Sequence, residues 1–193
     1  MTMRKLKLQV QMTIDGYAAT TNRESIDFNW DDVENELKDF EIANLEQVDS
    51  LILGRKTAPE FIPYWAVVAE NPDDPWFLLG KKLTDTPKIV FSKTLANSEW
   101  ANTTVAKGEI VDEINNLKKQ PGNDIMVYGG VSFVSSLIMN GLIDEYYLAV
   151  NPIAIGSGWS IFKELDSKQR MTLVKTTSLK CGIVWLQYEP KNT

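Results

Sequence analysis

The sequence contains no histidine and a single cysteine, Cys181. The missing histidine excludes histidine-based catalytic triads, histidine-ligated zinc and the most common general base. One cysteine cannot form a disulfide within the chain, and a thiolate metal site is not expected, so we predict that the protein binds no metal. Any proton transfer must therefore depend on a carboxylic acid or an ordered water.

Long apolar runs are also absent, because no stretch approaches the roughly 20 residues that a membrane span requires. The first seven residues alternate basic and apolar side chains and lack the apolar region and cleavage site of a signal peptide. We therefore expect a cytoplasmic protein that does not contact a membrane. The net charge of −6 argues against nucleic acid as a partner, although a local cluster of cations can still receive an anionic ligand.

Segments with strand and helix periodicity alternate along the chain and end in an antiparallel hairpin. This order predicts an α/β fold with a mostly parallel sheet. No linker interrupts the 193 residues, so residues 1–193 are expected to form one domain. Four prolines between residues 59 and 75 predict an irregular segment there. The expected strands cover residues 6–14, 50–53, 88–92, 103–106, 125–128, 145–150, 171–177 and 183–188, and the expected helices cover about residues 31–45, 76–83, 110–117 and 132–139.

Two glycines, Gly129 and Gly130, stand between an expected strand and an expected helix. Glycines at such a junction let the backbone approach a ligand closely, and the helix start offers free N–H groups to an anion such as a pyrophosphate. The alternative is a tight turn that binds nothing. The spacing is not the GxGxxG pattern of dinucleotide-binding folds, so the pair does not decide between these interpretations.

Cationic and hydroxyl side chains follow two other expected strands, in Gly54-Arg55-Lys56-Thr57 and in Ser92-Lys93. Arginine and lysine at a strand end can bind phosphate through charge-assisted hydrogen bonds. Each segment taken alone is also typical of a solvated surface turn. Their succession at strand ends of an acidic protein predicts an anionic cofactor with more than one phosphate.

The motifs of these segments resemble, in order, those of the dihydrofolate reductase superfamily. The closest resemblance is to its branch that contains the pyrimidine reductase domain of riboflavin biosynthesis. It implies a dihydrofolate reductase-like, three-layer α/β/α fold with a mostly parallel mixed sheet and a C-terminal antiparallel hairpin. The matching stretches are QMTIDGYAA, LILGRKT, IVFSKT, IMVYGGVSFVSSLI and LIDEYYLAVNPIAIGSGWSIF.

The resemblance implies NADPH as the cofactor. The segment after Gly54 would lie near the adenosine and its phosphates, and the glycine pair with the following helix start would hold the pyrophosphate. Ser92 and Lys93 would help to hold the 2′-phosphate. Tyr17 and Ala18 would lie near the nicotinamide, and Gly156 would follow the strand that borders the pocket. The residues implied to bind NADPH are Tyr17, Ala18, Gly54, Arg55, Lys56, Thr57, Ser92, Lys93, Gly129, Gly130, Val131, Ser132, Phe133 and Gly156.

Dihydrofolate reductases hold their substrate with an acid on the first helix, but the matching region here offers several acids without a unique alignment. Asp32 is the first candidate for the catalytic acid and Asp31 the second. Both are also typical of acids that cap the first turn of a helix. Trp30 and Glu60 are the candidate substrate-binding residues. The acids of this region are Asp27, Asp31, Asp32 and Glu34.

The resemblance implies an NADPH-dependent reductase that transfers a hydride to a small heterocyclic, carbonyl or imine substrate, as 5-amino-6-(5-phosphoribosylamino)uracil reductase does. Two alternatives remain open: a true dihydrofolate reductase, and a non-catalytic NADPH-binding module. The resemblance also implies a homodimer. Neither an H-x-E nor a C-x-x-C zinc signature occurs, so no deaminase half accompanies the domain in this chain.

Overall fold

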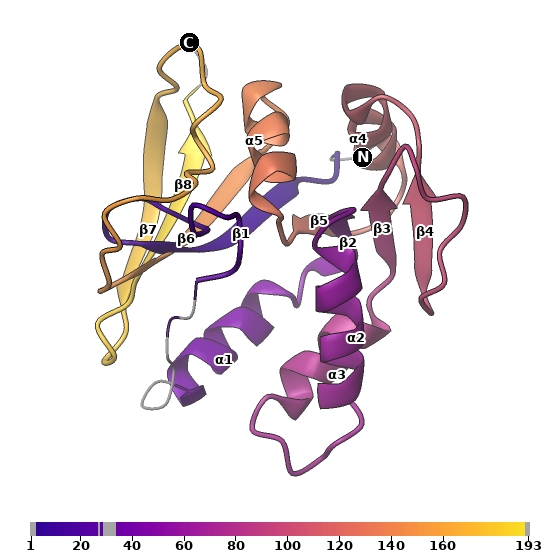
Figure 1. Cartoon of the computed structure of the whole chain (residues 1–193), viewed down its shortest axis with the longest axis horizontal. Helices are drawn as coiled ribbons and strands as arrows, with labels where there is room; N and C mark the ends of the chain where they lie inside the picture. Colours follow the sequence, from indigo (N-terminus) through magenta and orange to yellow (C-terminus); the bar gives the residue numbers. More distant parts are fainter. Residues whose placement is uncertain (1–2, 27, 29–33, 192–193) are drawn as a thin grey trace.

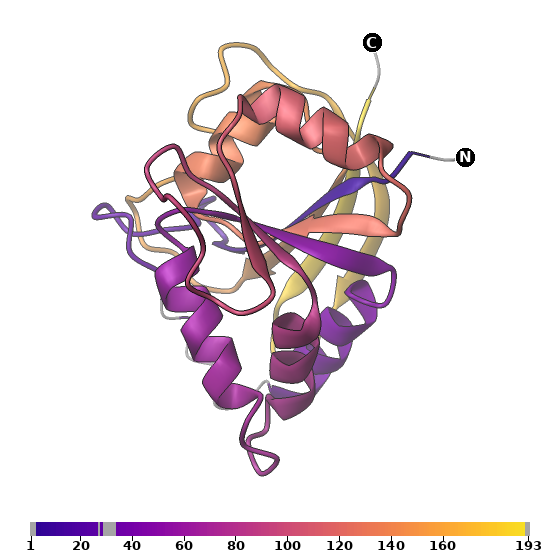
Figure 2. The same ribbon diagram turned by 90° about the vertical axis from the view of Figure 1, so that its right-hand side faces the viewer.

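The computed structural model describes residues 3–26, 28 and 34–191, without the side chains of residues 34 and 35. It contains one large sheet with helices on both faces (Figures 1 and 2). The elements in chain order are β1 (Leu6–Thr13), α1 (Glu34–Asn44), β2 (Val48–Gly54), α2 (Ala58–Val68), α3 (Phe77–Asp85), β3 (Lys88–Phe91), β4 (Thr103–Ala106), α4 (Ile110–Lys119), β5 (Asp124–Val127), α5 (Val131–Met139), β6 (Glu145–Asn151), β7 (Met171–Ser178) and β8 (Val184–Pro190).

The sheet has eight strands in the order β4-β3-β2-β5-β1-β6-β8-β7. The strands from β4 to β6 run parallel to one another, and β8 and β7 complete the sheet as an antiparallel hairpin. The predicted dihydrofolate reductase-like α/β/α fold is therefore confirmed. In this arrangement, the carboxyl ends of six strands meet at one edge of the sheet.

The central strand β1 presents chemically different faces to the two helical layers. Leu6 and Leu8 lie in the main core cluster, where side chains of α4 and α5 pack against them. The alternate residues Lys7 and Gln9 are polar, yet each is at least nine-tenths buried. A central parallel strand is ordinarily apolar on both faces, because helices cover both. The polar face of β1 is therefore a feature that the fold alone does not require.

The predicted irregular segment is wrong in its first half, because α2 forms there. Pro59 stands in the first turn, where the backbone N–H groups have no helical acceptor in any case. Pro63 lies inside the helix and removes only one helical hydrogen bond. Ile62 is buried with Leu53 and Val90 of the sheet, and Val68 is buried beside Gly80 of α3, so tertiary packing outweighs the unfavourable propensity of the prolines.

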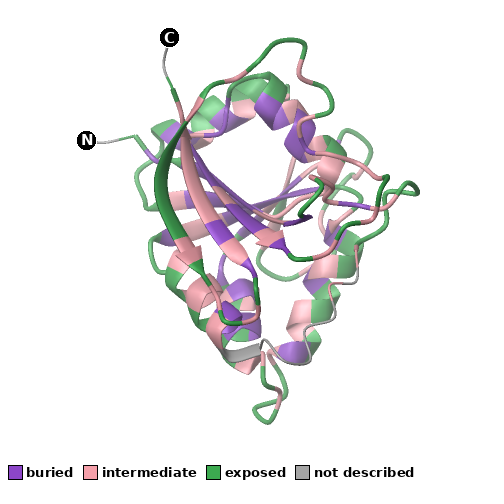
Figure 3. Cartoon of the chain, turned by 90° about the vertical axis from the view of Figure 1, so that its left-hand side faces the viewer, coloured by how far each residue is buried: buried purple, intermediate pink, exposed green. Residues whose placement is uncertain are grey.

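The edge strand β7 differs from the rest of the sheet in its exposure. Most of its residues are exposed, and it forms the largely green strand at the side of the molecule in Figure 3. Its neighbour β8 is mostly half-buried and carries the fully buried Trp185. Within the described ranges, no helix is long and apolar enough to span a bilayer.

Candidate cofactor and substrate site

The turns that follow β2 and β5 contact each other at the carboxyl edge of the sheet. The backbone N–H of Gly54 donates a hydrogen bond to the carbonyl oxygen of Gly129 over 3.1 Å. The chain therefore brings the GRKT segment directly against the glycine pair, although Gly54 and Gly129 are 75 positions apart in sequence. Gly129 has a φ of +76°, a conformation that favours glycine, and a cis peptide bond joins it to Gly130.

Close packing holds these two turns together and leaves no room for side chains at two glycines. A Cβ on Gly54 would lie 2.9 Å from the Cβ of Phe133, and one on Gly130 would lie 2.7 Å from the Oγ1 of Thr57. Both distances are shorter than ordinary van der Waals contact. The backbones of β2, β5 and α5 thus approach one another closely, with Gly54 buried and Gly129 and Gly130 half-buried.

The N-terminus of α5 opens onto the same place. Its N-cap residue is Gly130, which offers no side chain to the first turn. The first intrahelical bond runs from the N–H of Val134 to the carbonyl of Gly130. The N–H groups of Val131, Ser132 and Phe133 precede it and have no helical acceptor. Together with the helix dipole, they provide donors for an anion.

The predicted cations differ in their availability. Arg55 and Lys56 are exposed, and within the described part of the chain neither forms an ion pair. Lys93 instead pairs with Glu109 over 2.6 Å at the surface. The buried Ser92 is also engaged, since its Oγ accepts backbone N–H groups of the turn that follows it. Arg55 and Lys56 are therefore the cations free to meet a phosphate.

The remaining predicted cofactor residues gather at the ends of β1 and β6. Asp15 links these two strand ends, because its carboxylate accepts the backbone N–H of Gly156 over 2.8 Å and the hydroxyl of Thr13. The Thr13 hydroxyl and the backbone N–H groups of the β6 loop lower the pKa of Asp15. Tyr17 and Ala18 follow in the same turn, where Ala18 N–H donates to the carbonyl of Trp159. The predicted nicotinamide side thus forms a second group of turns beside the first.

An acid that sequence reasoning did not consider lies beneath this edge, between α1 and β1. Gln11 Nε2 donates to the carboxyl group of Glu41 over 3.2 Å. Burial raises the pKa of Glu41 to about 7, and the nearby amides of Gln11 and Gln9 moderate that increase. A carboxyl group that titrates near neutrality can hold or release a proton under working conditions. Glu41 follows Leu37 by four residues, so the apolar stripe of the helix was the available signal for its inward position.

Comparison with known proteins decides the family. The chain matches the RibD C-terminal domain over residues 4–185. It belongs to the RibD C-terminal domain family. It is also 31% identical over 192 residues to the protein YyaP of Bacillus subtilis (strain 168), covering 96% of this chain and 94% of YyaP.

Solved structures place this RibD-type chain among related folds. A protein of Shewanella sp. PV-4, described as a riboflavin biosynthesis protein, superposes with a TM-score of 0.71 and 25% identity, covering 98% of this chain and all of that one. Dihydrofolate reductase from Enterococcus faecalis, complexed with NADP(H), superposes with a TM-score of 0.61 and 14% identity, covering 97% of each chain. The second likeness shows the shared fold.

Several predicted substrate residues of this RibD-type chain have no described position. Asp31, Asp32, Trp30 and the alternative Asp27 lie outside the described residues, and the side chain of Glu34 is not described. Glu60 is exposed in the first turn of α2, where an acid favours the helix dipole. Its substrate role stays a prediction, as do the roles of the predicted cofactor residues.

Proposed function

We propose that this protein is an NADPH-dependent reductase that transfers a hydride to a small heterocyclic, carbonyl or imine substrate. The observation that carries the proposal is the junction of the β2 and β5 turns, where the glycine backbone, the N-terminus of α5 and two cations meet. These cations, Arg55 and Lys56, form no ion pair with any described residue. Ligands of open α/β sheets bind at this edge. An acidic protein with unpaired cations here is suited to a cofactor with several phosphates.

Relatives support the same chemistry. The Thermotoga maritima protein with a TM-score of 0.68 and 16% identity is named a diaminohydroxyphosphoribosylaminopyrimidine deaminase/5-amino-6-(5-phosphoribosylamino)uracil reductase; the match covers 98% of this chain and 57% of that one. The reductase half of that name fits the family of the present chain. By this resemblance, we infer a substrate of the pyrimidine kind and a role in riboflavin biosynthesis.

The residues present fit NADPH. The helix start at Val131, Ser132 and Phe133 would hold the pyrophosphate, and Arg55 and Lys56 would hold the adenosine phosphates, with Lys93 available if it leaves Glu109. The turns of Tyr17 and Gly156 would border the nicotinamide, which supplies the hydride when bound. Because the sequence lacks histidine, a carboxyl group or an ordered water must supply the accompanying proton.

Glu41 is the carboxyl group that we infer for this proton. Its raised pKa allows it to stay protonated up to about pH 7, unlike an ordinary surface acid. Asp32 and Asp31 remain the alternatives from the sequence. The pH profile of activity separates these candidates. If Glu41 holds the proton, wild-type activity falls above about pH 7, and the activity of Glu41→Gln does not show this pH dependence.

Titration of the purified protein with NADPH and with NADH, followed by cofactor fluorescence, tests the proposal. We expect saturable binding that is tighter for NADPH, because only NADPH carries the 2′-phosphate. Oxidation of NADPH with 5-amino-6-(5-phosphoribosylamino)uracil, compared with dihydrofolate, then tests the reaction. Failure to bind either cofactor contradicts the proposal, whereas binding without turnover on either substrate favours a non-catalytic NADPH-binding module.

A further inference from the structure

A chain of three side chains leads from the end of β6 to Glu41. Asn151 Nδ2 donates a hydrogen bond to Gln11 Oε1 over 3.1 Å, and Gln11 Nε2 donates to Glu41 Oε1 over 3.2 Å. Asn151 is the last residue of β6, whereas Gln11 lies on β1 and Glu41 on α1. Asn151 is only 1% exposed, so its amide must find its hydrogen-bond partners within the protein.

The backbone around Asn151 determines which end of its amide faces Gln11. The Nδ2 atom also lies 3.1 Å from the carbonyl oxygen of Met12 and 3.1 Å from that of Ala149. A carbonyl oxygen can only accept hydrogen bonds, so exchanging the amide oxygen and nitrogen would place an oxygen against two acceptors. The two backbone carbonyls therefore fix Nδ2 as the atom that faces Gln11.

Asn151 in turn determines how the Gln11 amide is oriented. A side-chain amide has a donor end and an acceptor end. Because Nδ2 of Asn151 is a donor, Gln11 must present its Oε1 there, and its Nε2 is then directed to Glu41. If the Gln11 amide were turned over, two donors would meet at Asn151. The carbonyl oxygen of Gln11 would then face the carboxyl group of Glu41.

The orientation of the Gln11 amide affects the charge state of Glu41. An N–H donor stabilises the ionised carboxylate, whereas a carbonyl oxygen can accept a hydrogen bond only from the protonated acid. In the observed orientation, the amides of Gln11 and Gln9 lower the pKa of Glu41 against the larger effect of burial, which raises it to about 7. The Gln11 N–H therefore favours release of the proton.

No described charge competes with these amides at Glu41. None of the ion pairs between described residues includes Glu41. The titratable group that faces it from β5 is the phenol of Tyr128, which follows that strand. This phenol stays neutral, because burial and the nearby Glu41 raise its pKa. From β1, the facing side chains are the uncharged amides of Gln9 and Gln11.

We propose that Asn151 is a positioning residue for the reaction, because it fixes the Gln11 amide so that an N–H, and not a carbonyl oxygen, meets Glu41. The inference rests on the proposed function, since it concerns the acid that we infer for the proton. Asn151 acts through Gln11. Glu41 is half-buried, so solvent can return its proton after each turnover.

The test follows the titration of Glu41 itself in Asn151→Leu, in Gln11→Met and in the double variant. These substitutions remove the amides and nearly keep the side-chain volumes. The Glu41 carboxyl carbon is observed by NMR in protein labelled at its glutamates, and Glu41→Gln assigns the signal. Asn151→Leu should raise the titration midpoint by at least about 0.5 pH units, because the donor to the carboxylate is no longer held in place.

The double variant separates positioning from an independent effect. If Asn151 acts through Gln11, the midpoint in the double variant should equal that in Gln11→Met, because no amide is left to orient. Additive shifts overturn the inference, since Asn151 would then affect Glu41 by another route. If Asn151→Leu does not fold, Asn151→Ser replaces it, because the serine hydroxyl is too short to hold Gln11.

Ser135→Ala is the control for the loss of a buried hydrogen bond. Ser135 is 3% exposed, and its hydroxyl donates to the carbonyl of Ile161 over 2.9 Å. It lies on α5, which packs on the opposite face of the sheet. Ser135→Ala should lower the melting temperature without moving the Glu41 midpoint. A midpoint that moves as far in Ser135→Ala as in Asn151→Leu overturns the inference, since any loss of stability would then produce the shift.

The pH profile of NADPH oxidation connects the titration with the reaction. Its alkaline limb should move in Asn151→Leu by the same amount as the Glu41 midpoint. A midpoint that moves while the profile stays in place overturns the role in the reaction. An unchanged midpoint in folded Asn151→Leu overturns the inference outright. Absence of NADPH oxidation by the wild-type protein contradicts the proposed function instead, and the NMR titration distinguishes the two failures because it requires no turnover.

Discussion

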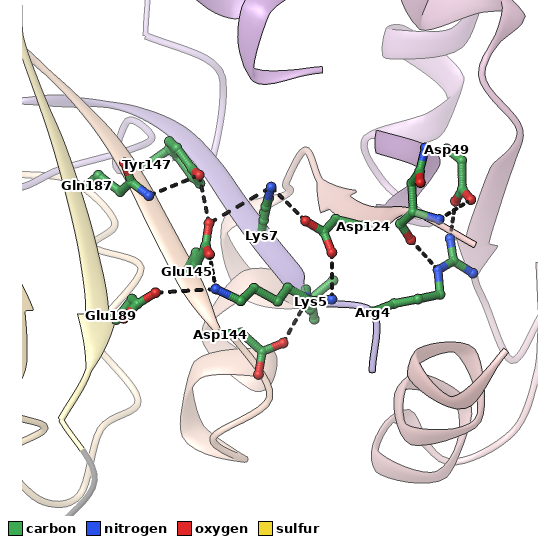
Figure 4. Close-up of polar contacts among 12 residues, drawn as sticks. Arg4, Lys5, Lys7, Asp49, Asp124, Asp144, Glu145, Tyr147, Gln187 and Glu189 are labelled. Carbon is green, nitrogen blue, oxygen red and sulfur yellow. Dashed lines mark hydrogen bonds and ion pairs between the residues drawn. The ribbon is translucent and has the colours of Figure 1, made fainter. Parts of the chain in front are cut away.

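The two edges of the parallel sheet differ in how their cations are paired with acids. At the amino edge, buried cations meet acids of other strands: Arg4 pairs with Asp49, and Lys7 with Asp124 (Figure 4). Lys118, whose side chain is 8% exposed, pairs with an acid at 2.5 Å. At the carboxyl edge, Arg55 and Lys56 remain exposed, and neither pairs with any described residue.

The difference indicates which edge serves the fold and which serves binding. A buried charge without a partner strongly destabilises a protein, so the amino edge must satisfy its charges internally. Exposed cations at a helix N-terminus cost the fold little and keep their hydrogen-bonding capacity for a ligand. Substitutions at the two edges should therefore affect different measurements.

The largest expected effect is on stability, at the amino edge. Arg4→Met should lower the free energy of unfolding by about 3 kcal/mol, because Asp49, Ser50 and the carbonyl of Asn123 all lose a donor. Denaturant unfolding measures this change. Lys81→Met, which removes an exposed ion pair with Asp85, is the control and should cost less than about 0.5 kcal/mol. Equal costs would contradict the contrast between buried and exposed pairs.

The second effect is the dependence of stability on pH that Glu41 produces. The raised pKa of Glu41 means that the unfolded chain loses this proton from about pH 4.5 upward, while the folded protein keeps it until about pH 7. Stability from this group is therefore full below pH 4.5 and is lost as the pH rises through 7, by about 2 kcal/mol after allowance for partial exposure.

The difference in unfolding free energy between Glu41→Gln and wild type, measured from pH 4 to 8, isolates this group. The neutral amides Gln9 and Gln11 and the phenol of Tyr128 face it, and Tyr128 stays protonated because its own pKa is raised further. Because the sequence has no histidine, no imidazole titrates between pH 4 and 8 to obscure this difference. A difference that does not vary with pH would show that Glu41 titrates as an ordinary surface acid.

At the carboxyl edge, Arg55→Ala should weaken NADPH binding by about tenfold to 150-fold, which corresponds to losing a charge-assisted contact of about 1.5–3 kcal/mol. NADH should be affected less, and the melting temperature should not change. Arg170→Ala, which removes an exposed arginine just before β7, is the matched control. Equal weakening of NADPH binding and NADH binding would show that Arg55 does not recognise the 2′-phosphate.

The smallest expected effect is the change in NADPH affinity when Lys93 is released from Glu109. Glu109→Gln frees the Lys93 ammonium from its surface ion pair, which is worth at most about 1 kcal/mol. NADPH affinity should then rise about twofold to threefold, and Lys93→Ala should lower it. Fluorescence titration at low ionic strength measures both. No change in either variant would place Lys93 outside the cofactor site.

Sequence reasoning located the strand ends and their order because glycine, cations and hydroxyls follow buried strands in a recognisable way. It missed α2, since two prolines outweighed the apolar residues that packing against the sheet buries. It also missed Gln9 and Glu41. Alternating polarity in β1 is typical of a half-exposed strand, and only the tertiary position of β1 in the centre of the sheet shows that its polar face is buried.

A crystal structure of the protein with NADPH tests the central claim most directly. We predict the pyrophosphate at the N–H groups that begin α5 and the 2′-phosphate within hydrogen-bonding distance of Arg55 or Lys56. The nicotinamide should lie beside the turn of Tyr17, with Glu41 as the nearest acid. A cofactor bound away from the β2–β5 junction, or one whose phosphates face the amino edge, would contradict the account.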